Sequence, residues 1–120
     1  MANILAVDDS VSIRHLVTET LAAAKHRVAV ADSGLTGLSA ATKERFDLVI
    51  TDVNMPGMDG LTFVKKLREL PAYRTTPILI LSTEMDPEKK KIAKNAGATG
   101  WLVKPFDPSQ LLAIIKKVTD

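Results

Sequence analysis

The chain has 120 residues, 46% hydrophobic and 25% charged, a composition typical of a globular protein and a length that predicts one domain, residues 1–120. It contains no cysteine, which excludes disulfides and thiolate metal sites and fits the reducing cytoplasm, where we expect the protein to reside. The net charge of +2 is too small to indicate nucleic-acid binding, and no apolar run approaches the roughly 18 residues of a membrane span, so neither a nucleic acid nor a membrane is expected as a partner.

Five short runs rich in β-branched and aliphatic residues recur along the chain. Each run is almost continuously apolar, with little alternation between apolar and polar positions, a pattern typical of parallel strands that are covered on both faces. The predicted strands are residues 3–7, 27–31, 47–51, 77–81 and 100–103.

Helical patterns, with apolar residues three and four positions apart, separate the predicted strands. Ser10 or Ser12 is placed to cap the first helix, and Ser33 the second. The expected apolar stripes consist of Ile13, Leu16, Val17, Thr20, Leu21 and Ala24 in the first helix, Leu35, Leu38 and Ala41 in the second, and Leu61, Phe63, Val64, Leu67 and Leu70 in the third.

The fourth and fifth helices have clear start signals, an aspartate followed by a proline, at Asp86 and Asp107. Gly97 is placed to end the fourth helix in the left-handed conformation. The fourth helix has the thinnest apolar face in the chain, because it offers only Ile92, Ala93 and Ala96 as a buried stripe.

Alternation of five strands with five helices predicts a doubly wound α/β fold, because consecutive parallel strands are joined by right-handed helical crossovers. We expect a three-layer sandwich with the parallel sheet in the middle. In open sheets of this kind, ligands bind beyond the carboxyl ends of the strands. The polar residues that follow the strands are therefore the candidates for a site.

Polar side chains follow four of the five predicted strands. Asp8 and Asp9 end the first strand, Asp52 the third, Ser82 the fourth and Lys104 the fifth. If these strands are neighbours, three carboxylates, a hydroxyl and an ammonium group meet in one cleft.

Neighbouring carboxylates repel one another, by about 4 kcal/mol for a pair about 4 Å apart at an effective dielectric constant near 20. A hard divalent cation removes that repulsion, and Mg²⁺ suits the site because it binds carboxylates, keeps several waters and also binds phosphate oxygens. Together, Mg²⁺ and Lys104 balance the three acids. A site of this kind can accept a phosphoryl group without strong repulsion.

The segment "DVNMPGMDG" after the third strand supports this interpretation. Pro56, Gly57 and Gly60 force turns, which leave main-chain carbonyls near Asn54 free to face the cleft. Carboxylates can act as nucleophiles and form aspartyl phosphates. Asp52 stands alone at its strand end and is the best candidate for this nucleophile.

Each candidate also has an ordinary structural explanation. The acidic pair can cap the first helix, Asp52 can belong to a turn, and Lys104 can be a solvated surface residue. Their occurrence together at four strand ends favours a common site. The lysines of the fourth helix are most simply a solvated face, with a partner-binding role as the alternative; they are Lys89, Lys90, Lys91 and Lys94.

The motifs "VDDS", "DVNMPGMDG", "LST" and "KPF", in this order and spacing, closely resemble the receiver domain of two-component response regulators. The resemblance implies a flavodoxin-like (βα)5 fold with strand order 2-1-3-4-5. It implies that Asp52 is the phosphoacceptor. It also implies that Asp8, Asp9 and Asp52, with the main-chain carbonyl of Asn54, hold Mg²⁺.

By the same resemblance, Ser82 is the hydroxyl that turns toward the phosphoryl group, Lys104 pairs with that group, and Pro105 follows a cis peptide bond. Trp101 occupies the position of a rotating aromatic residue, which is usually Tyr or Phe. Indole is larger and carries an N–H donor, so that a switching role and ordinary packing are both open for Trp101.

The resemblance implies a phosphorylation-dependent signalling switch that accepts a phosphoryl group on Asp52 from a histidine kinase. We expect Mg²⁺-dependent self-phosphorylation and self-dephosphorylation, but no enzymatic turnover. No output domain fits after Asp120, so we expect a monomer that signals by contact with another protein, as chemotaxis regulators do. The expected contact face comprises the fourth helix, fifth strand and fifth helix.

Alternatives with the same chemistry are a phosphorelay shuttle and a receiver excised from a larger regulator. The rival from another class is a Mg²⁺-dependent phosphohydrolase with an aspartate nucleophile. Haloacid-dehalogenase-like enzymes of this class usually carry D-x-D after the first strand and further segments around the substrate, and neither feature is found here. A nucleotide-binding module is weaker still, because the glycine-rich phosphate-binding motifs are absent.

Overall fold

The structure, a computed structural model, describes residues 2–119. Its strands are β1 (Asn3–Val7), β2 (Arg27–Ala31), β3 (Leu48–Thr51), β4 (Ile78–Ser82) and β5 (Gly100–Val103). Its helices are α1 (Val11–Ala23), α2 (Gly34–Lys43), α3 (Gly60–Glu69), α4 (Pro87–Ala96) and α5 (Pro108–Thr119), with a short 3-10 helix, η1 (Pro71–Tyr73). The predicted strands are confirmed to within one residue at each end, whereas η1 was not predicted.

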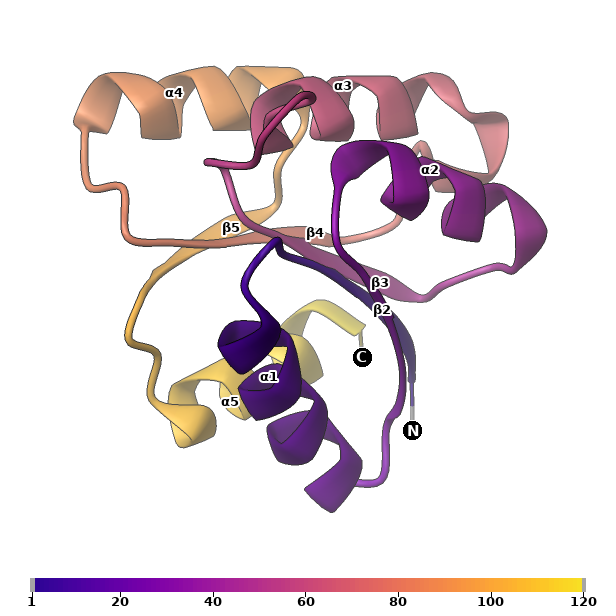
Figure 1. Cartoon of the computed structure of the whole chain (residues 1–120), viewed down its shortest axis with the longest axis vertical. Coiled ribbons are helices and arrows are strands. Elements are labelled where there is room, and N and C mark those ends of the chain that lie inside the picture. The colour runs from indigo at the N-terminus through magenta and orange to yellow at the C-terminus, as the bar shows by residue number, and fades with distance from the viewer. Residues whose placement is uncertain (1, 120) are drawn as a thin grey trace.

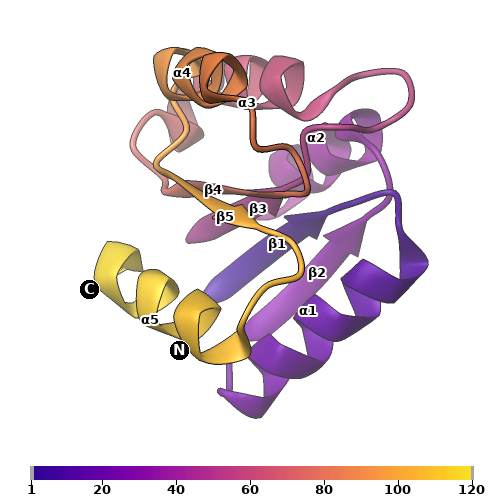
Figure 2. The same cartoon turned by 90° about the vertical axis from the view of Figure 1, so that its left-hand side faces the viewer.

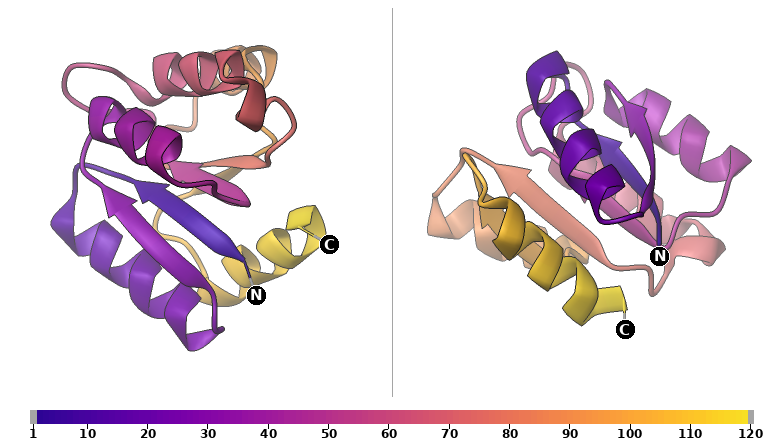
Figure 3. Two further views of the ribbon diagram at one scale, coloured as in Figure 1. Left: turned by 90° about the vertical axis from the view of Figure 1, so that its right-hand side faces the viewer. Right: turned by 90° about the horizontal axis from the view of Figure 1, so that it is seen from below.

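The five strands form one parallel sheet in the order β2-β1-β3-β4-β5, which confirms the doubly wound, flavodoxin-like fold. Helices α2, α3 and α4 cover one face of the sheet, and α1 and α5 cover the other (Figure 1). The view from the β5 side shows the sheet between these two helical layers (Figure 2), and α1 and α5 lie side by side when seen from below (Figure 3).

The hydrophobic core has two parts, one on each face of the sheet. Phe63, Val64 and Leu67 of α3 dominate the part beneath α2–α4, while Leu21 of α1 and Leu111 of α5 belong to the other. The central strands β3 and β4 are buried along their whole length, as their continuous apolar runs predict. The edge strands β2 and β5 are only partly buried.

Side-chain caps begin the helices where the sequence places capping residues. Ser10, Ser33 and Asp86 each accept a hydrogen bond from a main-chain N–H in the first turn of their helix. Gly97 ends α4 with φ of +113°, in the left-handed region. These predicted helix boundaries are confirmed.

The prediction that Leu16, Ala24, Leu35 and Ile92 belong to buried apolar stripes is wrong, because all four are exposed. Ala24 lies one residue beyond the end of α1. Leu16, Leu35 and Ile92 are 42%, 69% and 50% exposed. Each lies roughly 100–140° around its helix from the residue that is buried there, because successive residues turn by about 100°. The buried residues taken for this comparison are Leu21 in α1, Ala41 in α2 and Ala93 in α4. Val17 in α1 and Gly34 and Gly37 in α2 are buried as well, and the apolar stripes are narrower than predicted.

Arg68 joins α3 to the end of α4. Its Nε and Nη2 donate to the carbonyl oxygen of Gly97, at 3.1 and 2.8 Å, and its Nη1 donates to those of Tyr73 and Thr76, both at 2.6 Å. Burial lowers the pKa of Arg68 from its usual value, but a guanidinium stays charged in proteins. The C-terminal end of α4 is thus firmly attached to α3.

Candidate functional site

The register of the sheet brings Asp8 and Asp52 together at the carboxyl ends of neighbouring strands. Val7 of β1 pairs with Thr51 of β3, and the next residue in each strand is an aspartate. The N–H of Asp52 donates to the carbonyl oxygen of Val7 at 3.1 Å, which continues the pairing by one residue. Both aspartate side chains are buried.

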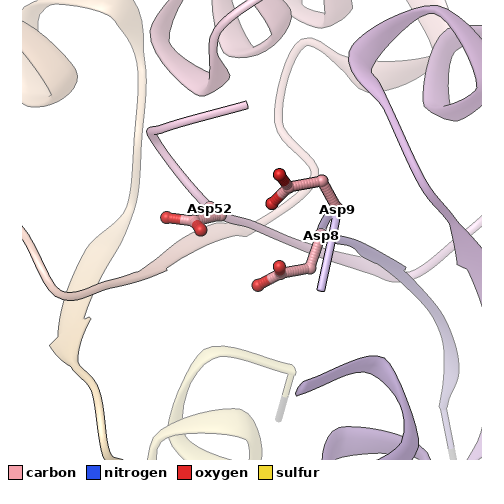
Figure 4. Close-up of side chains that lie close together, drawn as sticks. All are labelled: Asp8, Asp9 and Asp52. Carbon is pink, nitrogen blue, oxygen red and sulfur yellow. The ribbon is translucent and has the colours of Figure 1, made fainter. Parts of the chain in front are cut away.

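Asp9 completes a group of three carboxylates (Figure 4). Asp8, Asp9 and Asp52 each offer an oxygen atom, and these atoms lie within 4.8 Å of one another. Unlike the other two, Asp9 is exposed. The sequence-predicted acidic cluster is therefore brought together at the carboxyl end of the sheet.

Lys104 bridges the two buried carboxylates. Its Nζ lies 2.6 Å from Oδ2 of Asp8 and 3.0 Å from Oδ2 of Asp52, and the lysine side chain is only 9% exposed. Burial alone lowers the pKa of Lys104, but the hydrogen bonds and charges of the two aspartates outweigh burial and raise that pKa above its usual value. The ammonium group is charged at neutral pH and offsets part of the repulsion within the cluster.

The remaining carboxylate oxygens differ in how they are held. Oδ1 of Asp52 accepts from the N–H of Val53 at 2.7 Å, and Oδ1 of Asp8 accepts from the N–H of Ser10 at 2.9 Å. Within residues 2–119, no hydrogen bond reaches the carboxylate of Asp9. An all-oxygen donor set with one solvent-facing carboxylate fits Mg²⁺, which prefers oxygen ligands and keeps several waters.

The loop between β3 and α3 packs directly on the phosphoacceptor candidate. Gly57 adopts φ of +77° and makes the turn that the sequence predicts. Gly60 is needed for a different reason, since a Cβ there would overlap the main-chain oxygen of Asp52. Asn54 lies exposed in this loop.

Ser82 is fully buried at the end of β4 and is linked to α4 through Glu84. Oγ of Ser82 accepts from the N–H of Glu84 at 3.1 Å. The carboxylate of Glu84 in turn accepts from the N–H of Asp86 and from Nζ of Lys89, both at 3.2 Å. Sequence reasoning missed Glu84, although its position between Ser82 and the capping Asp86 was a signal.

Trp101 lies half-buried on β5, next to α4. Its indole Nε1 is the one buried side-chain nitrogen or oxygen in residues 2–119 that lacks a hydrogen-bond partner. Nζ of Lys90 lies 6.0 Å from the centre of the ring, at the limit of a cation–π contact. Lys90, Lys94 and Trp101 line a hollow of about 280 Å³ between α4 and β5.

The last two predicted positions follow β5. Lys104 is at the cluster, and the peptide bond between Lys104 and Pro105 is cis.

Arg14, by contrast, was missed by sequence reasoning. Its Nη1 donates to the main-chain oxygen of Asp8 at 2.6 Å. A contact that reaches back across six residues follows no fixed helical spacing, so no sequence pattern indicates it.

Comparison with known proteins identifies the family. Residues 4–116 match the response regulator receiver domain. The chemotaxis protein CheY-3 of Vibrio cholerae is 36% identical over 116 residues, which cover 96% of this chain and 89% of that protein. The cyclic di-GMP phosphodiesterase response regulator RpfG of Xanthomonas campestris is 38% identical over 113 residues, but the match covers only 30% of its length.

A solved structure of chemotaxis protein CheY4 of Vibrio cholerae has the same fold. It is 53% identical in sequence, superimposes with a TM-score of 0.95, and the match covers 98% of each chain. The chain belongs to the response regulator receiver domain family. As the resemblance implied, it is a phosphorylation-dependent signalling switch of the two-component type.

None of the helices between residues 2 and 119 has the length and apolarity needed to cross a membrane.

Proposed function

We propose that Asp52 is the phosphoacceptor of this receiver and that Asp8, Asp9, Asp52 and the main-chain carbonyl of Asn54 hold Mg²⁺. When bound, Mg²⁺ supplies positive charge to the oxygens of the transferring phosphoryl group. The observation that carries the proposal is the bridge from Lys104 to both Asp8 and Asp52. It shows a charged donor already placed at the carboxylate that would be modified.

In the proposed transfer, a carboxylate oxygen of Asp52 attacks the phosphorus of a phosphohistidine on the kinase. The new P–O bond forms as the P–N bond breaks, and the histidine nitrogen leaves with the electron pair and takes up a proton. Lys104 then pairs with a phosphoryl oxygen. Water removes the phosphoryl group by attacking the phosphorus. The bond from phosphorus to the Asp52 oxygen breaks, the carboxylate is regenerated and inorganic phosphate leaves with the protons of the water, so the protein is self-dephosphorylating rather than an enzyme with turnover.

The proposed signal travels through the loop between β4 and α4. Ser82 turns its hydroxyl from Glu84 toward the phosphoryl group, and the change removes one of the bonds that hold the loop. Glu84 also contacts Asp86 and Lys89 at the start of α4. Movement at Ser82 therefore reaches the first turn of this helix directly.

The proposed output is contact with another protein on the face formed by α4, β5 and α5, with the protein acting as a cytoplasmic monomer. The likeness to CheY4 and CheY-3 along nearly the whole chain supports a chemotaxis-type role. The lysines that line the hollow between α4 and β5 favour an acidic partner, whose binding weakens as salt rises.

Intact-mass measurement after treatment with acetyl phosphate tests the proposal. Wild-type protein should gain one phosphoryl group only when Mg²⁺ is present, and Asp52→Asn should gain none. Asp47→Asn is the matched control. Asp47 is an exposed aspartate that directly precedes β3, at the amino end of the strand, whereas Asp52 follows its carboxyl end. A full phosphoryl adduct on Asp52→Asn would show that another residue is the acceptor.

A further inference from the structure

Arg14 is a cationic residue beside the acidic cluster that the proposed chemistry does not use. It is the fourth residue of α1, in the first turn of the helix, and its half-buried side chain folds back past the start of the helix. Nη1 donates to the main-chain oxygen of Asp8 at 2.6 Å. None of the ion pairs within residues 2–119 includes Arg14. Its guanidinium therefore serves a main-chain carbonyl rather than a carboxylate.

The carbonyl that Arg14 holds belongs to the peptide group between Asp8 and Asp9. A peptide group is planar and rigid, so fixing its oxygen fixes the direction in which the chain enters Asp9. The side chain of Asp8 is already held by Lys104 and by the N–H of Ser10. The carboxylate of Asp9 accepts no hydrogen bond from residues 2–119. The orientation of this carboxylate therefore depends on the direction of the main chain at Asp9.

We propose that Arg14 is a positioning residue for the Mg²⁺ site, because it holds the Asp8–Asp9 peptide group so that Asp9 faces Asp8 and Asp52. This inference rests on the proposed function, in which the three carboxylates surround Mg²⁺. Hydrogen bonds from charged donors are shorter and stronger than neutral ones. The 2.6 Å contact has that character.

The sign of the effect separates positioning from simple electrostatics. A guanidinium is always charged, so by charge alone Arg14 repels Mg²⁺, and its removal would tighten Mg²⁺ binding. Positioning acts in the opposite direction. Residues that orient metal ligands change metal affinity by about 10–100-fold when they are replaced. Weaker binding after loss of the positive charge is therefore a result that only positioning explains.

Calorimetric titration of the full chain with Mg²⁺ alone gives the dissociation constant directly. Arg14→Met keeps the aliphatic stem and removes the donor, and it should raise the dissociation constant about tenfold. Arg74→Met is the matched control, because Arg74 is an exposed arginine outside the site. This variant should bind Mg²⁺ with the same dissociation constant as the wild type. Unchanged or tighter binding by folded Arg14→Met would overturn the proposal.

Arg14→Lys provides a second test that does not depend on the stability of Arg14→Met. It keeps the positive charge but has a shorter reach and no planar fork, so it should also bind Mg²⁺ more weakly than the wild type. Equal binding by Arg14→Lys and wild type would overturn the proposal. Failure of the proposed function is distinguishable, because in that case the wild type itself would not bind Mg²⁺ or accept a phosphoryl group on Asp52.

Discussion

Helices α3 and α4 lie in the same layer and differ chiefly in what they bury (Figure 1). Each has 10 residues, and each is preceded by a capping aspartate, Asp59 or Asp86, whose side chain accepts a main-chain hydrogen bond. The buried residues of α3 are Gly60, Phe63, Val64 and Leu67, whereas only Ala93 is buried in α4. Apolar burial is the main stabilising term for a helix on a sheet, so α3 is held far more strongly.

The attachments of α4 add to this contrast. Its C-terminal end is fixed by Arg68, which donates twice to the carbonyl of Gly97. Its N-terminal end is held through the exposed Asp86 and the contacts of Glu84. One helical layer thus combines a deeply packed helix beside Asp52 with a helix that buries little. We expect the weakly packed helix to move at lower cost.

Truncation of one side chain in each helix gives the largest expected difference. Phe63→Ala should lower the free energy of unfolding by about 3–5 kcal/mol, because a fully buried aromatic ring is lost. Ile92→Ala should cost less than about 1 kcal/mol, because Ile92 is half exposed. Urea unfolding of both variants measures these values. Equal losses would show that α4 is as firmly packed as α3.

Removal of Lys104 tests the rigid side of the contrast. Lys104→Met leaves two adjacent buried carboxylates without their cation, so the metal-free protein should lose about 3 kcal/mol of stability, part of which Mg²⁺ restores. Such a variant should still accept a phosphoryl group slowly but transmit the signal poorly. Denaturant unfolding with and without Mg²⁺ provides the measurement, and an unchanged stability would contradict the bridging role.

The stabilisation by Lys104 should also depend on pH. Because folding raises the pKa of Lys104, its contribution is fully present below the unfolded value of about 10.5 and is lost as pH rises through the folded value. The difference in stability between wild type and Lys104→Met should therefore be constant near neutral pH and shrink above roughly pH 10.5. If the difference in stability instead grew as the pH rose through this range, folding would lower the pKa of Lys104 rather than raise it.

Asp9→Ala should have the smallest effect on stability and a large effect on metal binding. Without metal, the variant should be as stable as the wild type or slightly more so, by up to about 1 kcal/mol, because one repelling but exposed carboxylate is gone. Thermal melts with and without Mg²⁺ measure both properties. If Mg²⁺ raises the melting temperature of this variant as much as that of the wild type, Asp9 is not a ligand.

The sequence was sufficient to predict the sheet and the place of the site. The central strands are continuous apolar runs, and the polar residues at their ends must meet because parallel strands share a carboxyl edge. Contacts made by long side chains could not be predicted in this way. Arg14 reaches back across six residues and Arg68 reaches across 29, and neither distance is fixed by helical or strand periodicity.

Hydrogen exchange with and without beryllofluoride, a phosphoryl mimic, tests most directly whether the site acts on the weakly held helix. A switch from 1:99 to 99:1 requires about 5.5 kcal/mol, and charge-assisted hydrogen bonds contribute roughly 1.5–3 kcal/mol each. Protection should change across residues 82–104, most strongly in the first turn of α4, while α3 remains unchanged. Unchanged protection across residues 82–104, with changes confined to α2, would contradict the central claim that α4 and β5 carry the output.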